Sequence, residues 1–150
     1  MNATEKRQVP KSGGFTLVEL IITLLILGIL AGIAVPIYLG QREKSKNVEA
    51  QENLLALRQL LEQYYNENGC YYKASGSTCA ATPATTISGV TNIQAFLTGF
   101  KPGNANGLYF NYNITFPAGA ATFNAVAARS GTTNANNIFS IDQNNNRQGF

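Results

Sequence analysis

The sequence predicts an α+β fold in which one long N-terminal helix, apolar in its first half and amphipathic in its second, packs on a small antiparallel β-sheet. Three observations support this: a nearly uncharged apolar run from 15 to 35, apolar residues at helical spacing from 50 to 64, and apolar–polar alternation from 108 to 116. We divide the chain into a polar leader (1–14), a membrane-spanning helix (15–36), an amphipathic helix (37–68), a connecting region with a disulfide (69–107) and a β-meander (108–150).

The leader is polar and basic, and it has no apolar stretch of its own. A secretory signal peptide is cut after its hydrophobic region, whereas here the small residues Gly13 and Gly14 come before it. The leader's charged residues are three cations and one acid: Lys6, Arg7, Lys11 and Glu5. By the positive-inside rule, these cations predict a cytoplasmic N-terminus and an outward C-terminal part.

The apolar run that follows is long enough to cross a membrane. It contains 21 residues from Phe15 to Val35, and Glu19 is the one charged residue among them. At about 1.5 Å per residue, such a helix is roughly 31 Å long, which matches the hydrocarbon thickness of a bilayer. A carboxylate near the start of this run is costly unless it reaches the surface or finds a partner.

The stretch Gly14-Phe15-Thr16-Leu17-Val18-Glu19 resembles the processing site of class III signal peptides, which is the prepilin signature of type IV pilins and type II secretion pseudopilins. The resemblance implies that prepilin peptidase cuts between Gly14 and Phe15 and that the new amine of Phe15 is methylated. It also implies that Glu19 pairs with the Phe15 amine of a neighbouring subunit during assembly. Opposite charges attract strongly in a low-dielectric surrounding, and neither is stable there alone.

The function that this resemblance implies is structural. The chain would be a subunit of a type IV pilus with the type IV pilin fold, held in the inner membrane with its N-terminus in the cytoplasm. The pilus assembly machinery would then polymerise it with other copies into a helical filament at the cell surface, without a cofactor. Two alternatives stay open, namely a type II secretion pseudopilin or minor pilin, and a membrane-tethered binding module with an uncut N-terminus.

Small residues and a proline interrupt the apolar helix at Gly28, Gly32 and Pro36. Pro36 removes a backbone donor and is expected to kink or loosen the helix. The resemblance implies that the segment from Gly28 to Pro36 partly melts on assembly. The alternative is that these residues only let helices pack closely.

The second half of the helix is predicted to be amphipathic. Its apolar stripe consists of Ala50, Leu54, Leu57, Leu61 and Tyr64, and its charged band of Arg42, Glu43, Lys44, Lys46, Glu49 and Glu52. The spacing predicts ion pairs between Lys46 and Glu49 and between Arg58 and Glu62. The charged band is either a solvated face or a docking surface for another subunit. Gly69 is expected to cap the helix after Asn68.

Cys70 and Cys79 are the two cysteines of the chain, and we predict a disulfide between them because the other features point outside the cytoplasm. The bond would stabilise the fold by about 2.5 kcal/mol in the chain-entropy model. Two cysteines without a histidine make a poor zinc site, and their spacing is not that of a redox motif.

The region from 80 to 107 reads as a long connection with one short helix, formed around Ile93 and Phe100 and ended near Gly99 and Pro102. Three strands follow, separated by a turn at 117–119 and by a polar loop. We predict them at 108–116, 121–129 and 138–142, joined as an antiparallel meander. The apolar face of this sheet would cover the stripe of the amphipathic helix.

Composition excludes several classes of function. The chain has no histidine, which excludes serine–histidine catalysis and imidazole-ligated metals, so we expect no enzyme. Residues 15–150 hold eight cationic and seven acidic side chains, and this near-neutral balance gives no case for nucleic-acid binding. The resembled pseudopilins commonly carry a calcium site in a C-terminal acidic loop. Here that region offers Asp142 beside Asn144, Asn145 and Asn146, so we expect no metal.

Overall fold

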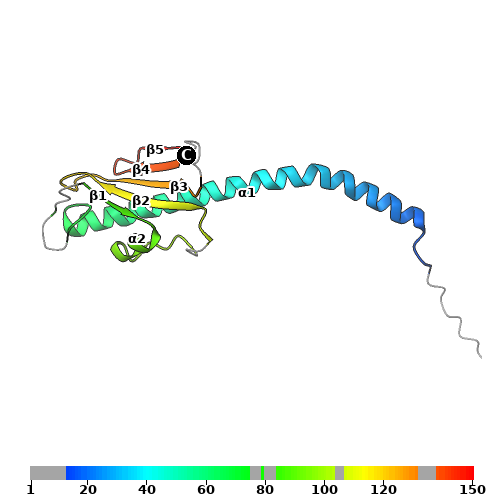
Figure 1. Ribbon diagram of the computed structural model, residues 1–150, viewed down its shortest axis with the longest axis horizontal. Helices are drawn as coiled ribbons and strands as arrows, with labels where there is room; N and C mark the ends of the chain where they lie inside the picture. The colour runs from blue at the N-terminus through cyan, green and yellow to red at the C-terminus, as the bar shows by residue number, and fades with distance from the viewer. Residues whose placement is uncertain (1–12, 75–78, 80–83, 104–106, 132–137) are drawn as a thin grey trace, which may run out of the picture. The chain divides into compact units, whose positions relative to one another are not determined.

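The computed structural model describes residues 13–74, 79, 84–103, 107–131 and 138–150, and the leader prediction for residues 1–12 lies outside these ranges. Its elements, in chain order, are α1 (Leu17–Asn68), β1 (Thr85–Ser88), α2 (Val90–Phe96), β2 (Phe110–Phe116), β3 (Asn124–Arg129), β4 (Ile138–Asp142) and β5 (Arg147–Gln148) (Figure 1). The chain forms two compact units, of which the first ends at Gln41 and the second runs from Arg42 to Phe150. The predicted α+β class, a long apolar helix with a small antiparallel sheet, is confirmed.

The first unit exposes almost all of its apolar side chains. Every large apolar residue of α1 from Leu17 to Leu39 is more than half exposed. The mean hydropathy of an 18-residue window in this helix reaches 2.8, so the helix is long and apolar enough to cross a membrane. Because water solvates such a surface poorly, this half of α1 requires lipid or other apolar helices around it.

The second unit holds a five-stranded antiparallel sheet in the order β1-β2-β3-β4-β5. In the register of its central strands, Ala125 lies opposite Ile114 on one side and Ile141 on the other. The predicted meander is therefore present. The bounds of its third predicted strand, β4, agree with the structure, whereas β2 and β3 begin later than predicted, at Phe110 and Asn124.

Two strands and the end of the short helix depart from the predictions. β1 lies within the region that was predicted to be a connection, and β5 was not predicted. Both are very short, and β1 is defined by pairing with the distant β2, where the Thr86 and Thr115 hydroxyls lie 3.1 Å apart. The short helix α2 ends at Phe96 because the chain turns there, so Phe100 is buried from a loop and not from a helix.

The core lies between one face of the second half of α1 and the inner face of the sheet (Figure 1). The predicted helical stripe is confirmed, since Ala50, Leu54, Leu57 and Leu61 are completely buried and Tyr64 packs partly buried against them. The sheet contributes alternating residues, as expected for strands with one covered face. They are Phe110, Tyr112, Ile114, Phe116, Ala125, Ala127, Phe139 and Ile141.

The helix ends as the sequence predicts. Gly69 has φ +76° and its N–H donates to the Tyr65 carbonyl at 2.7 Å, which is the left-handed cap that favours glycine. Immediately after it, a disulfide joins Cys70 and Cys79. The backbone N–H of Tyr71 then donates to the Ala120 carbonyl at 2.9 Å, which ties the end of α1 to the turn between β2 and β3.

Replacing Leu57 with alanine should destabilise the second unit strongly. The residue is completely buried, so the substitution leaves a cavity that costs about 2–5 kcal/mol. The matched control is Val48→Ala on the same helix, where 49% exposure predicts a change within about 0.5 kcal/mol. Thermal and urea unfolding of the full chain in detergent micelles measures both, and equal losses for the two variants would contradict this core.

Candidate functional site

The first turn of α1 is closed by a reciprocal pair of side chains, Thr16 and Glu19. The backbone N–H of Glu19 donates to Thr16 Oγ1 at 3.2 Å, while the Thr16 backbone N–H and hydroxyl donate to Glu19 Oε2 at 3.0 and 2.9 Å. This is a capping box, in which each side chain satisfies a backbone N–H that the helix leaves unpaired. It holds the carboxylate at the helix N-terminus, where the helix dipole favours a negative charge.

One oxygen of the Glu19 carboxylate remains available. Both hydrogen bonds from Thr16 end on Oε2, and Oε1 makes no hydrogen bond or ion pair within the part of the chain that the structure describes. Phe15 precedes the capping box and is 88% exposed. Phe15 thus lies four residues before Glu19, just outside α1, and one oxygen of the Glu19 carboxylate remains an open acceptor.

Gly13 and Gly14 lie before the helix in irregular, exposed backbone. A side chain built at either glycine would meet no atom within 4 Å. The fold of this chain therefore does not require glycine at these positions.

The predicted melting segment is helical in the structure. α1 continues through Pro36, and a side chain built at Gly28 or Gly32 would also meet nothing within 4 Å. These small residues therefore have no packing role inside one chain, and their predicted role concerns the assembled state.

An ion cluster (Glu43, Lys46 and Arg129) ties α1 to the end of β3. Glu43 Oε1 lies 2.7 Å from Lys46 Nζ, and Glu43 Oε2 lies 2.6 Å from Arg129 Nη2. Lys46 Nζ also lies 4.2 Å from the centroid of the Tyr109 ring. The predicted Lys46–Glu49 pair is wrong, because Lys46 binds the carboxylate that Arg129 also holds.

The remaining charged pairs of the helix are simpler. The predicted Arg58–Glu62 pair is present, with Arg58 Nη2 3.9 Å from Glu62 Oε1. Arg42, Lys44, Glu49 and Glu52 of the charged band are exposed.

The Asp142 carboxylate closes the turn between β4 and β5. Its Oδ1 accepts the backbone N–H groups of Asn144 and Asn146, both at 2.9 Å, and its Oδ2 accepts Asn146 Nδ2 at 2.7 Å. Partial desolvation raises the pKa of Asp142, but the bonds from Asn146 and Asn144 outweigh it and leave this pKa below its ordinary value. Both oxygens that could face a cation are thus engaged by N–H donors of the turn.

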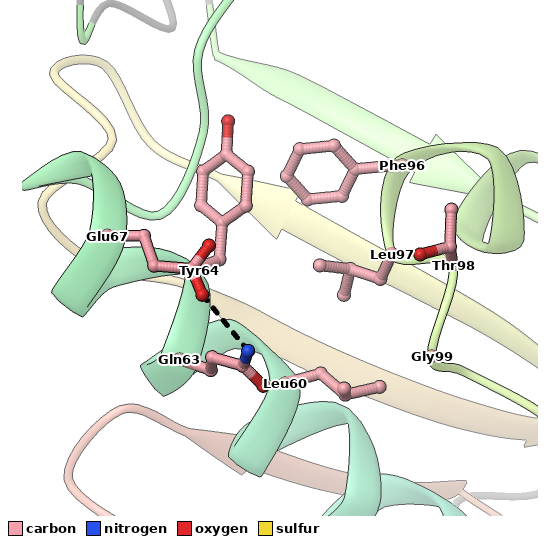
Figure 2. A pocket seen from close by; sticks show the side chains of 8 residues that line it. All are labelled: Leu60, Gln63, Tyr64, Glu67, Phe96, Leu97, Thr98 and Gly99. Carbon is pink, nitrogen blue, oxygen red and sulfur yellow. Dashed lines mark hydrogen bonds between the residues drawn. The ribbon is translucent and has the colours of Figure 1, made fainter.

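A groove of about 320 Å³ lies between α1 and the segment after α2 (Figure 2). Its lining residues are Leu60, Gln63, Tyr64, Glu67, Phe96, Leu97, Thr98 and Gly99. The rings of Tyr64 and Phe96 lie 4.9 Å apart, and Gln63 Nε2 donates to Glu67 Oε1 at 3.0 Å on the helical wall. A side chain at Gly99 would come within 2.8 Å of a Leu60 methyl group, so the loop runs close to the helix at this edge of the groove.

Comparison with known proteins identifies the N-terminal segment. A family model described as the prokaryotic N-terminal methylation motif matches residues 10–35, which contain Phe15, Glu19 and the capping box. The match concerns the N-terminal segment of the chain, and it supports a place in the type IV pilin and pseudopilin superfamily.

A type IV pilin and type II secretion proteins are both similar to part of this chain. It is 42% identical over 62 residues to the type IV major pilin protein PilA of Myxococcus xanthus, covering 41% of this chain and 28% of that protein. It is 38% identical over 65 residues to the type II secretion system core protein G of Vibrio cholerae, covering 43% and 44%. The core protein G of Escherichia coli is 35% identical over 71 residues, covering 47% and 46%. The chain thus spans less than half the length of these relatives, and no solved structure matches it.

Sequence reasoning missed two contributors to these sites. The first is Thr16, and its capping role could have been predicted, because a threonine followed three residues later by glutamate before an apolar run is the sequence signature of a capping box. The ion pair of Arg129 with Glu43 had no such signal, since the two residues are far apart in the chain and meet only when β3 packs beside α1.

The Glu43 ion cluster predicts a loss of stability in acid. The Lys46 hydrogen bond, followed by that of Arg129, lowers the pKa of Glu43 in the folded chain below its ordinary 4.5. A group with a lowered folded-state pKa contributes stability above its unfolded pKa, and this contribution disappears as the pH falls through the folded value. Unfolding of the full chain should therefore become easier below about pH 4.5.

The control for this prediction is Glu43→Gln, which removes the titrating group and keeps its size. Its pH profile should be flatter than that of the native chain in this window. Identical slopes for the two proteins would show that Glu43 does not contribute to the acid sensitivity.

Proposed function

We propose that this chain is a structural, non-catalytic subunit of a type IV pilus, which polymerises with other copies of itself into a helical filament. One observation carries the proposal. An apolar helix of membrane length is exposed over its whole first half and holds a single carboxylate in its first turn, with Glu19 Oε1 open. Such a surface is stable in a bilayer and also in a bundle of identical helices, so the chain can move from one environment to the other.

Maturation would begin at the exposed backbone before α1. Prepilin peptidase would cut between Gly14 and Phe15, and the new amine of Phe15 would be methylated. Because the fold does not need glycine at position 14, a requirement for it would come from the peptidase. The exposed, non-helical conformation of Gly13 and Gly14 suits a scissile segment.

Assembly would then pair charges in the filament core. The amine of Phe15 in an arriving subunit would bind Glu19 Oε1 of a neighbour, while the capping box keeps the carboxylate oriented through Oε2. Both charges leave water or the lipid headgroups for an apolar surrounding, where each needs the other. The helix from Gly28 to Pro36 would loosen at this stage.

Before assembly, the subunit would lie in the inner membrane with its N-terminus in the cytoplasm, oriented by the cations of the leader. Its partners would be the peptidase, the pilus assembly machinery and further copies of the chain. The second unit would face outward and become the surface of the filament.

A second function, as a type II secretion pseudopilin or minor pilin, is favoured by the similarity to core protein G of two organisms. The two functions differ in where the mature chain accumulates. Surface filaments sheared from cells should contain an abundant N-terminal peptide that begins at methylated Phe15, as mass spectrometry can show. The same peptide confined to the membrane fraction would favour the second function.

Replacing Gly14 with valine should leave the precursor uncut. The change places a branched side chain next to the scissile bond, while nothing in the folded chain lies within 4 Å of it. We expect immunoblots to show one band of precursor size, with the disulfide and thermal unfolding of the second unit unchanged. Normal maturation of this variant would contradict the assigned cleavage site.

Two substitutions at Glu19 separate its charge from its capping role. Glutamine can replace glutamate in a capping box, whereas alanine cannot. If the charge is required, Glu19→Gln and Glu19→Ala should both mature normally and both reduce sheared filaments by about tenfold or more, because one charge of a buried pair then lacks its partner. Native filament yield from Glu19→Gln, with a loss only in Glu19→Ala, would reduce the role of Glu19 to capping.

A further inference from the structure

We propose that the groove between α1 and the segment after α2, called the α1–α2 groove below, receives Arg147 and Phe150 of a second copy of this chain. The contact would join the second units of neighbouring subunits head to tail. The inference rests on the proposed function as a polymerising subunit, and it names a contact outside the helical core. Three observations support it: a preformed projection, a groove of matching chemistry, and the positions of both on the second unit, called the head below.

The projection is the Arg147–Phe150 pair. The guanidinium carbon of Arg147 lies 5.4 Å from the centroid of the Phe150 ring, and this ring packs edge-on against Phe139 at 6.1 Å. Phe150 nevertheless remains 41% exposed. The pair thus combines a cation with an aromatic surface on the outside of the head.

The backbone holds this pair in place. Gly149 has φ +81°, and it runs so close to the Ile138 carbonyl that a side chain at this position would overlap the oxygen. Arg147 is oriented as well, because its Nε donates to Asn145 Oδ1 at 3.1 Å. A projection that is already ordered loses less conformational entropy when it binds.

The groove offers what this pair lacks. Figure 2 shows the Tyr64 and Phe96 rings side by side, with Leu97 nearby and Glu67 on the helical wall. Aromatic rings of this kind pack well against a further ring. Glu67 and Arg147 each lack an ion-pair partner among the described residues, so a contact between them would pair two otherwise unpaired charges.

Phe150 and the groove lie toward opposite ends of the second unit, while Arg147 lies between them, opposite Ile141 of β4. Phe150 packs on Phe139, which contacts Phe110 at the end of β2 that pairs with Arg129, the partner of Glu43. The groove is at the other end of this part of α1, around Glu67, and the 24 residues of helix from Glu43 to Glu67 correspond to about 36 Å. In Figure 1 the mark C and the end of α1 accordingly lie at opposite ends of the sheet.

This arrangement fits a filament. A contact between two different surfaces of the same protein leaves one of each unused at the ends of every complex, so it propagates unless it closes into a ring. In the proposed filament the apolar helices would hold the subunits together. The contact between the heads would then fix the rotation of each subunit relative to the next. A second copy is therefore the occupant that the groove and the projection together favour.

Charge reversal and exchange test the contact in cells that assemble the native chain. Glu67→Arg alone and Arg147→Glu alone should each mature normally and lower the yield of sheared filaments by about tenfold, because like charges then meet in the groove. The double variant Glu67→Arg/Arg147→Glu restores opposite charges and should recover filaments to within about threefold of native. Lys73→Glu, which makes the same change of charge as Arg147→Glu but lies beside β1, should assemble normally.

The outcomes separate this contact from the proposed function. The contact would be overturned if either single variant gave as many filaments as the native chain, or if the double variant did not recover. In both cases, filaments formed by the native chain would still support a pilus subunit. Absence of filaments from the native chain would instead count against the pilus function, and with it this contact. Thermal unfolding of each purified full chain in detergent must stay within a few degrees of native, so that a loss of filaments reports on contact and not on folding.

Discussion

The exposed apolar surface of α1 is the constraint on which the rest of the structure depends. From Leu17 to Leu39 the helix is apolar on every side, and such a helix is stable only where lipid or other helices surround it. This explains why its one charge is at the first turn, at the end of the apolar span and under the influence of the helix dipole. It also explains why the folded head is confined to the second unit, where the same helix acquires a polar face.

One continuous helix therefore serves two kinds of packing. In its second half, four completely buried residues face the sheet and the opposite side remains in water. The Glu43 ion cluster stands at the beginning of this half and links the helix to β3 with two short charged contacts. Since ion pairs that remain partly in contact with water contribute modestly to stability, the cluster acts mainly by fixing where the sheet sits along the helix, while the buried leucines supply most of the free energy.

The main architecture could be predicted from local sequence patterns, because its causes are local. The stripe from Ala50 to Leu61 and the alternation in β2 follow directly from helical and strand periodicity. The two edge strands could not be predicted, since four and two residues carry too little pattern, and pairing with distant strands defines them. For the candidate site, Glu19 stood out as an isolated charge, whereas the shared use of Glu43 by Lys46 and Arg129 depends on tertiary contact.

The shortness of these edge strands has a consequence for the proposed pilus subunit, which would be stored and used at high density. Unpaired strand edges are templates for sheet-to-sheet aggregation, and molecules crowded in a membrane meet one another constantly. The sheet ends with four residues on one side and two on the other, and Arg147 places a positive charge on the shorter edge. Neighbouring copies in such a filament would offer little backbone for amyloid-like pairing, which would leave side-chain contacts to determine how they associate.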